Sequence, residues 1–204
     1  MHSEKVDAQD SAGVTLIRGG NADEQVNITG SYEVKCLDAE GNLKWEDSIK
    51  NLVVTVGKNN LLDKYFKGSA YTAGWYMGLV DNASFLNYSA ADTLASHAGN
   101  GTTTGWIEFL SYSVSGGSTT NRAAPAWNTA GTPTAGSLST QATTFTITAN
   151  GNVQGALMCT TLEKGTATDG GAGILYSAGT FTGSNRAVAS GDSLLVTYTA
   201  SVSG

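Results

Sequence analysis

Apolar and small polar residues alternate along much of this 204-residue chain, and this alternation constrains its fold more than any other feature. In TFTITA, Phe145 and Ile147 alternate with threonines. The stretch SLLVTYTASV has an apolar residue at every second position: Leu194, Val196, Tyr198, Ala200 and Val202. YTAGWYMGLV does the same with Tyr71, Ala73, Trp75, Met77 and Leu79. Successive side chains of a β-strand point to opposite faces of the sheet, so each stretch would bury one face. Glycine-punctuated strands of this kind predict an all-β, antiparallel β-sandwich that is jelly-roll-like.

Charged residues are distributed unevenly and divide the chain. They make up 14% of the sequence, whereas about 25% is usual for a soluble domain. Residues 1–68 hold eight of the eleven Lys and Arg and eleven of the seventeen Asp and Glu. Only nine charged residues remain in the 136 residues from Ser69 onward. We therefore predict an extended N-terminal arm (residues 1–25) and a β-sandwich domain (residues 26–204). Within that domain, residues 26–68 form a hairpin and a short helix, and residues 69–204 form charge-poor sandwich strands.

The N-terminal arm is polar except for one short apolar run. The first residues, MHSEKVDAQDSAG, show no periodicity, and GVTLIRGG follows between glycines. Such a segment buries too little apolar surface to offset its own ordering entropy, so it needs a partner. The predicted partner-binding residues of this run are Val14, Leu16, Ile17 and Arg18, and GVTLIR has the composition of a strand that adds to an exposed sheet edge.

A hairpin and a helix are expected before Gly68. Tyr32, Val34 and Cys36 alternate with charged residues, DAEGN has turn composition, and a second strand follows. Cys36 is expected to be a small core residue. In TVGKNNLLDKYFKG, Thr55 is the predicted N-cap and Gly68 the stop signal. Apolar residues at helical spacing lie between them: Leu61, Leu62, Tyr65 and Phe66.

Composition also bounds the partners. A net charge of −6 and a pI near 4.7 argue against nucleic acid, because neutralising phosphates needs a stripe of Lys or Arg. We expect no membrane span, since no apolar run approaches about 20 residues, and no secretory signal in the polar start. The two cysteines, Cys36 and Cys159, suit a reduced compartment better than a disulfide framework.

Three residue types of a hydrolytic triad occur together in SAADTLASHAG: Asp92, Ser96 and His97. A triad requires the nucleophile to bond the base and the base to bond the acid. Ser96 and His97 are adjacent, so their side chains leave a strand on opposite faces and diverge by about 100 degrees on a helix. No nucleophile-elbow motif surrounds Ser96. We therefore interpret His97 as a structural loop residue and expect no enzyme.

Metal and phosphate sites are weakly indicated. One central histidine and two distant cysteines do not make a zinc site. Asp81 and Asp92 flank a polar stretch that lacks the spacing of a calcium loop, which leaves only weak calcium binding open. GNGTTTG and GGAG imitate phosphate-binding loops but are interpreted as turns with positive φ. No cofactor is expected.

The tryptophans divide by context. Trp75 and Trp106 lie in strand-like stretches, where core packing is expected. Trp127, in the loop-like RAAPAWNTAG, is the best candidate for a surface contact.

Several blocks, taken in order, resemble small structural proteins of tailed-phage virions, in particular capsid decoration (cement) proteins. These blocks are NLVVTVGKNNLLDKYFKGSAYTAGWYMGLV, AADTLASHAG, NRAAPAW, TFTITANGNVQGALMCTT and GDSLLVTYTASVS. Together they span residues 51–203. The chain departs from the family pattern after SHAG, where NGTTTG precedes Trp106 and the family tends to have a shorter link.

The resemblance implies a β-sandwich, often trimeric, on the outer surface of an icosahedral head assembled in the bacterial cytoplasm. The implied partners are the major capsid protein and further copies of the chain, and no catalytic residues are implied. In that setting ADTLASHAG is a turn-and-strand block, and the arm would anchor the protein to the shell or to a neighbouring copy. Ile107 and Phe109, on a strand with two apolar faces, suggest the trimer contact.

Two other functions stay open. A tail-associated or receptor-binding module would share the composition and would present Trp127 to a glycan. A hydrolase would use Asp92, Ser96 and His97.

Overall fold

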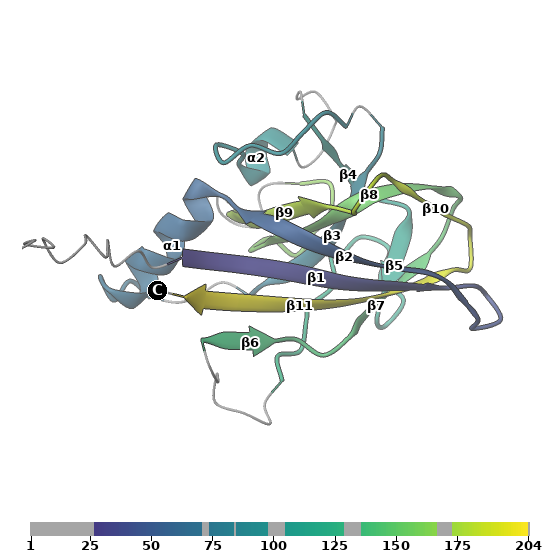
Figure 1. The fold of residues 1–204 in the computed structure, drawn as a ribbon, viewed down its shortest axis with the longest axis horizontal. Coiled ribbons are helices and arrows are strands. Elements are labelled where there is room, and N and C mark those ends of the chain that lie inside the picture. Colours follow the sequence, from purple (N-terminus) through teal and green to yellow (C-terminus); the bar gives the residue numbers. More distant parts are fainter. Residues whose placement is uncertain are drawn as a thin grey trace, which may run out of the picture.

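The computed structural model describes residues 27–70, 74–83, 85–97, 105–128, 136–166 and 173–203 (Figure 1). The described part contains two helices, α1 (Thr55–Tyr65) and α2 (Leu94–His97). Its strands are β1 (Asn27–Leu37), β2 (Leu43–Val53), β3 (Tyr76–Asp81), β4 (Ile107–Phe109), β5 (Tyr112–Val114), β6 (Ser137–Ser139), β7 (Thr143–Ile147), β8 (Gly151–Cys159), β9 (Leu175–Thr180), β10 (Arg186–Val188) and β11 (Ser193–Ser203). The predicted arm, with Val14, Leu16, Ile17 and Arg18, lies outside the described residues.

All the strand pairings between these elements are antiparallel, and they form one nearly closed path in the order β4-β3-β8-β9-β2-β1-β11-β7-β5, with β10 beside β8 and β6 beside β11. Strand β2 belongs to both layers of the sandwich. Its residues from Leu43 to Asn51 pair with β1, whereas Leu52 and Val53 pair with β9. We call β1, β2, β11, β7, β5 and β6 the hairpin sheet, and β4, β3, β8, β9 and β10 the covered sheet. The predicted all-β sandwich is confirmed, and the finer expectation of jelly-roll connectivity stays a prediction.

The predicted hairpin of β1 and β2 is also confirmed. Its turn is closed by Asp38, whose Oδ1 accepts the backbone N–H groups of Glu40 at 3.0 Å and Asn42 at 2.7 Å. Hydrogen bonds from Asn42 lower the pKa of the Asp38 carboxyl. Gly41 has φ +87°, which L-residues with a Cβ rarely adopt, so the turn requires its glycine.

Helix α1 occurs where expected, but the predicted N-cap at Thr55 is wrong. Thr55 is already helical, and the cap position is Val54, which makes no side-chain cap. The Thr55 N–H donates instead to the carbonyl of Ala90 at 2.9 Å, so a distant segment satisfies this end of the helix. The predicted stop at Gly68 has φ +72°. Gly57 lies against the backbone of Tyr176 in β9, where a Cβ would come within 2.5 Å of the carbonyl oxygen.

The first hydrophobic core lies between the two sheets. It contains the inward residues predicted from the alternation, all buried: Tyr32, Val34, Cys36, Met77, Leu79, Phe145, Ile147, Leu194, Val196 and Tyr198. The alternation fades at the end of β11, where Ala200 is partly buried and Val202 is exposed. Tyr71 and Ala73 of the predicted β3 face lie outside the described residues.

A second core lies on the outer face of the covered sheet. It is formed by Val54, Val80, Leu94, Trp106, Leu157, Cys159, Leu175 and Ala178. Two parts of the chain cover this core. One is α1, and the other is formed by residues 85–97 with Gly105 and Trp106, which together we call the covering lobe. The covered sheet is therefore buried on both faces, which is why β8 is buried at every residue from Val153 to Cys159.

Helix α2 in the covering lobe corrects two predictions, because only one helix and a turn-and-strand block were expected. Thr93 and Ser96 cap its single turn reciprocally. The Ser96 N–H donates to Thr93 Oγ1 at 3.3 Å, and the Thr93 N–H donates to Ser96 Oγ at 3.1 Å. This is the hydrogen-bond pattern of a capping box, with serine in place of the usual Glu or Gln.

The tryptophan predictions for the core hold. Trp106 is buried in the second core, and Trp75 is partly buried against the first, with its ring 5.1 Å from that of Tyr176. Phe109 is buried in the first core, so it provides no surface for a trimer contact, whereas Ile107 is half-buried and the trimer stays a prediction. No helix in the described part of the chain is long and apolar enough to cross a membrane.

Candidate functional site

Asp92 and His97, the acid and base of the suspected triad, do come together. His97 Nε2 lies 3.0 Å from Asp92 Oδ1, and His97 Nδ1 lies 2.9 Å from the carbonyl oxygen of Trp106. Asp92 Oδ2 also accepts the Trp106 indole N–H at 2.9 Å and the Ser89 N–H at 2.8 Å. Because each ring nitrogen of His97 faces an acceptor, both contacts are hydrogen bonds only when both nitrogens carry protons.

Ser96 does not join this pair. Its hydroxyl lies 2.9 Å from Thr93 Oγ1 and donates to the Thr93 carbonyl at 2.9 Å. The reason is the one expected for neighbours on a helix, whose side chains diverge by about 100 degrees. His97 belongs to α2 rather than to a loop and is buried, so the structural role is right and the loop position is wrong. Within the part of the chain that the structure describes, the arrangement has an acid and an imidazole but no nucleophile bonded to them.

The cluster instead ties residues 85–97 of the covering lobe to Trp106, which directly precedes β4 of the covered sheet. The His97 ring stacks on Trp106, with centroids 4.1 Å apart and planes 12° apart. The Tyr88 ring also packs on Trp106, with ring centroids 5.6 Å apart. The Tyr88 hydroxyl donates to the Gly179 carbonyl of β9 at 2.8 Å. Burial raises the pKa of Tyr88, so its hydroxyl stays neutral and available as a donor. Polar side chains here hold the lobe in place.

A second buried polar cluster, which the sequence analysis missed, centres on Arg122. Its guanidinium binds Glu108 of β4 through two bonds, Nε to Oε1 at 2.8 Å and Nη2 to Oε2 at 2.7 Å. The remaining N–H groups donate to backbone carbonyls: Thr161 at 2.8 Å, Glu163 at 2.6 Å and Thr166 at 3.0 Å. All five donors of the arginine are used, and both charged side chains are inaccessible to solvent.

The Arg122 cluster ties three loops to the outer face of the covered sheet. Glu108 Oε2 also accepts the Gly165 N–H at 2.8 Å. The Lys164 ammonium donates to the carbonyls of Leu110 and Tyr112 and lies 4.0 Å from the Tyr112 ring centroid. Burial lowers the pKa of Lys164. One signal for this cluster was present in the sequence: after Ser69 charged residues are scarce, so an Arg and a Glu inside apolar stretches were candidates for a buried pair.

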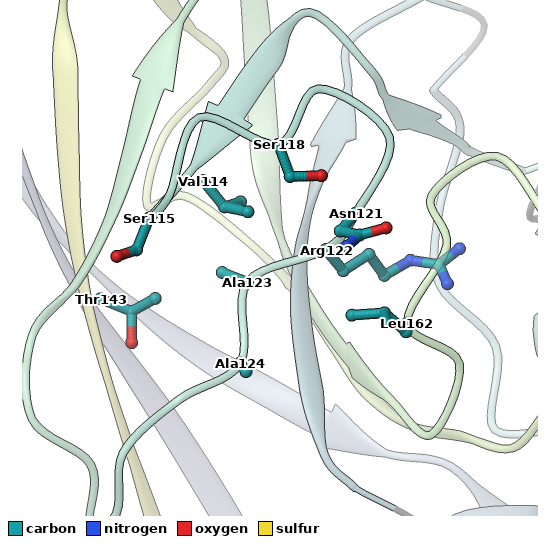
Figure 2. A pocket seen from close by; sticks show the side chains of 9 residues that line it. All are labelled: Val114, Ser115, Ser118, Asn121, Arg122, Ala123, Ala124, Thr143 and Leu162. Carbon is teal, nitrogen blue, oxygen red and sulfur yellow. The ribbon is translucent and has the colours of Figure 1, made fainter.

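The surface beside Arg122 has a shallow depression of about 180 Å³. It is lined by Val114, Ser115, Ser118, Asn121, Arg122, Ala123, Ala124, Thr143 and Leu162 (Figure 2). In Figure 2 the guanidinium points away from Ser115 and Thr143, toward the loop that carries Leu162. The depression therefore presents methyl groups, hydroxyls and an amide, and its arginine is committed to Glu108. It has the chemistry of a contact surface rather than of a catalytic pocket.

Among the described residues, the most exposed aromatic side chains lie at the end of α1, on its last residue and on the C-cap residue that follows. Leu62, Tyr65 and Phe66 are 49%, 78% and 77% exposed, and the rings of Tyr65 and Phe66 lie 5.0 Å apart. We call these three residues the α1 face. A groove of about 290 Å³ runs beside it, lined by Asn60, Leu61, Lys64, Tyr65, Trp75 and Tyr176. An apolar face of this kind is a typical place for a protein contact.

The outer surface of the hairpin sheet is rich in hydroxyls along β11, β7 and β6, whereas β1 and β2 present charged residues there, among them Glu33, Lys35 and Glu46. On β11, Leu194, Val196 and Tyr198 point inward, so the alternate positions Thr197, Thr199 and Ser201 point outward. Ser139 of β6 bonds Thr199 at 2.7 Å, and Thr144 and Thr146 of β7 are exposed. We call this surface, with Ser137 of β6, the hydroxyl face.

The other predicted site residues are placed as follows. Trp127 is partly buried against the first core, with its ring centroid 6.4 Å from that of Tyr198 and its backbone bridged to Thr140. Asp81 Oδ1 accepts the Ala83 N–H at 2.7 Å. The described residues contain no group of three or more His, Cys, Asp or Glu side chains able to hold a metal.

The glycine runs fall mostly outside the described residues, at positions 99–104 and 170–172. Gly105 is described and has φ +120°, as expected of a turn glycine. Cys36 and Cys159 are free and buried. Burial raises the pKa of Cys36 to about 12 and that of Cys159 to about 11, so neither is an activated thiol.

Comparisons with known proteins yield no match of the chain to a family model, a curated protein or a solved structure.

Proposed function

We propose that this chain is a structural protein of a tailed-phage virion, a head decoration protein that binds the outer surface of the major capsid shell and stabilises it. The proposal starts from the resemblance of the blocks within residues 51–203. Its partners are the major capsid protein and further copies of the chain, as a homotrimer. The protein would assemble with the head in the bacterial cytoplasm.

The hydroxyl face is the structural observation that carries the proposal. A protein that lies flat on a shell must remove water from a broad surface. Desolvating a hydroxyl costs far less than desolvating an unpaired charge, and small hydroxyl side chains lose little entropy on contact. Thr144, Thr146, Thr197 and Thr199 occupy outward positions of β7 and β11, so these two strands present hydroxyls in place of charges. This surface suits burial against another protein.

The polar clusters support a binding role over catalysis. Asp92 and His97 are bonded to Trp106, and Ser96 is bonded to Thr93. Arg122 uses all its donors within the domain. These groups stabilise the fold, which leaves contact surfaces as the features to be explained.

A reconstruction of the intact particle tests the location directly. Density for this fold on the head surface is the expected result, and density at the tail would overturn the proposal. Sedimentation of the purified protein at micromolar concentration tests the trimer, and a monomer would contradict it.

A pair of charge substitutions tests the contact surface. Thr144→Lys with Thr146→Lys should abolish binding to heads that lack the protein, because two lysines would lose water on contact. The matched control is Ser184→Lys with Ala187→Lys, at exposed positions elsewhere in the sandwich. Equal binding by both double variants would move the contact away from the hydroxyl face.

The glycan-binding alternative is tested with the same preparation. Binding to a glycan array that disappears with Trp127→Ala would favour the tail-associated module. Trp127 is partly buried, so the thermal stability of the variant must be measured alongside.

A further inference from the structure

We propose that the apolar run at residues 14–17 packs against the α1 face of the same chain. This inference goes beyond the proposed function, because it concerns the free protein and needs no capsid. Three features support it: an unpartnered apolar face, the place where the N-terminal segment enters the domain, and complementary chemistry.

The α1 face is unusual because Leu62 and Tyr65 of α1, with Phe66 after it, point away from the domain, while Val56 packs against the second core and Leu61 is half-buried. A surface helix normally buries its apolar stripe. Here the contact with β9 is made through Gly57, whose lack of a side chain allows close approach to Tyr176. Leu62, Tyr65 and Phe66 remain exposed, whereas Asn60 and Lys64 are half-buried. The described part of the chain leaves this face uncovered.

The N-terminal segment enters the domain at the same end. Gly30 of β1 pairs with Asn51 of β2, four residues before α1 begins at Thr55. Figure 1 shows α1 beside the start of β1 and the end of β11. Asn27 lies ten positions after Ile17, and in extended form that stretch reaches about 33 Å. Since α1 has 11 residues and is about 16 Å long, the run can reach any part of it.

The chemistry of the two parts is complementary. GVTLIR contains the main apolar run of a segment that is otherwise polar. Residues 1–26 carry five acidic and two basic side chains. Around the α1 face the balance is reversed, with Lys58, Lys64 and Lys67 against Asp63. Apolar contact would hold the run, and the charge difference would favour its approach at low salt.

The same chain is favoured over a neighbouring copy because the connection is short. A flexible linker of this length gives an effective concentration on the order of millimolar. A free second copy at micromolar concentration competes poorly with it. The segment of a neighbouring copy is therefore an alternative outcome of the test.

Hydrogen exchange on the full chain tests the contact. We expect the amides of residues 14–18 to exchange roughly tenfold more slowly than those of an unstructured peptide. The protection should be lost in Tyr65→Ser with Phe66→Ser, and equally in Leu16→Ser with Ile17→Ser, which leaves the described domain untouched. Leu43→Ser, an exposed leucine at the opposite end of β2, is the control and should retain protection. Absence of protection in the unmodified chain would overturn the proposal.

Disulfide trapping identifies whose segment is bound. Leu16→Cys with Leu62→Cys should form a cross-link within one chain under mild oxidation, seen as a faster-migrating monomer on a non-reducing gel. Leu16→Cys with Leu43→Cys should not. The native thiols are buried and do not interfere. A cross-linked dimer would overturn the intramolecular form, and no cross-link would overturn the contact. Neither experiment uses capsids, so a negative result in either one contradicts this contact but not the proposed function.

Discussion

The two sheets of the sandwich differ in how many of their faces are buried, and therefore in where their polar side chains find hydrogen-bond partners. The hairpin sheet has one face in the first core and the other in water, and β1 and β11 alternate accordingly between buried and exposed residues. The covered sheet has a core on each face, and β8 and β9 are almost entirely buried. A charged side chain on the outer face of the hairpin sheet reaches water. On the outer face of the covered sheet it must find its partners inside the protein.

This difference explains where the residues that look catalytic are found. Asp92, His97, Glu108 and Arg122 all lie on the outer side of the covered sheet, beside or within the second core. An unpaired charge there would cost several kcal/mol, on the order of 3–5. Each of the four is bonded to others or to backbone groups. A buried cluster of acid, base and hydroxyl types therefore reflects how a two-faced sheet is covered as readily as it reflects catalysis.

The largest expected effect is the removal of Arg122. Arg122→Met keeps most of the aliphatic stem but removes both guanidinium bonds to the Glu108 carboxylate, which retains only the Gly165 N–H, and removes the donors to three backbone carbonyls. We expect the free energy of unfolding, measured with urea, to fall by about 3–5 kcal/mol. Arg186→Met is the control, because Arg186 is 31% exposed and Asp47, although only 6% exposed, keeps the N–H groups of Ser48 and Thr182 as donors, so the loss should be clearly smaller. Equal losses would show that the outer face of the covered sheet is not specially demanding.

Replacing Asp92 should have the next largest effect. In Asp92→Asn an amide NH2 group replaces one of the two carboxylate oxygens. This NH2 group does not accept hydrogen bonds, so the side chain no longer accepts from both His97 and Trp106. We expect a loss of about 1–3 kcal/mol, seen in urea unfolding followed by tryptophan fluorescence. Asp38→Asn, which alters a carboxylate in the exposed hairpin turn, should cost clearly less. A neutral Asp92→Asn would remove the cluster as a fastener of the covering lobe.

Alkaline pH should weaken the covered sheet through Cys159. Burial raises the pKa of this thiol to about 11 from an ordinary value of 9.0. The unfolded chain loses the thiol proton from about pH 9, while the folded chain keeps it. The contribution of the Cys159 thiol to the free energy of unfolding is therefore complete below about pH 9. It is lost as the pH rises toward 11, at up to about 1.4 kcal/mol per pH unit. Comparing Cys159→Ala with the unmodified protein at pH 8 and pH 10 isolates this slope, and identical slopes would contradict the prediction.

The sequence predicts the hairpin sheet better than the covered sheet, and the reason is the number of buried faces. Alternation identifies strands such as β11 and β7 because one face is wet, and it places Val196 and Phe145 correctly inside. In β3 the alternation is incomplete, since Gly78 and Val80 are buried as well as Met77 and Leu79. A strand that is buried on both faces has no polar face from which its register can be inferred.

The candidate sites show the same limit. Spacing along the chain correctly separates Ser96 from His97, because neighbouring side chains diverge on any regular element. It does not predict that His97 and Asp92 meet, because that contact depends on how α2 turns back on Trp106. The Arg122 and Glu108 pair joins residues 14 positions apart, with β5 between them, so only the tertiary structure brings it together. Helical spacing predicts that Leu61, Leu62, Tyr65 and Phe66 share one helix, but it does not predict that three of them, Leu62, Tyr65 and Phe66, are exposed.

The smallest effect is expected on the outer face of the hairpin sheet. Lys35 and Glu46 pair there at 3.7 Å, with side chains 60% and 62% exposed. Lys35→Ala should change the free energy of unfolding by less than about 0.5 kcal/mol, and added salt should remove even that. The measurement is urea unfolding at two salt concentrations and two protein concentrations. A loss above about 1 kcal/mol that grows with protein concentration would mean that a second copy covers this face in solution. The hairpin sheet would then also be buried on both faces, and the contrast between the two sheets would hold only for the isolated subunit.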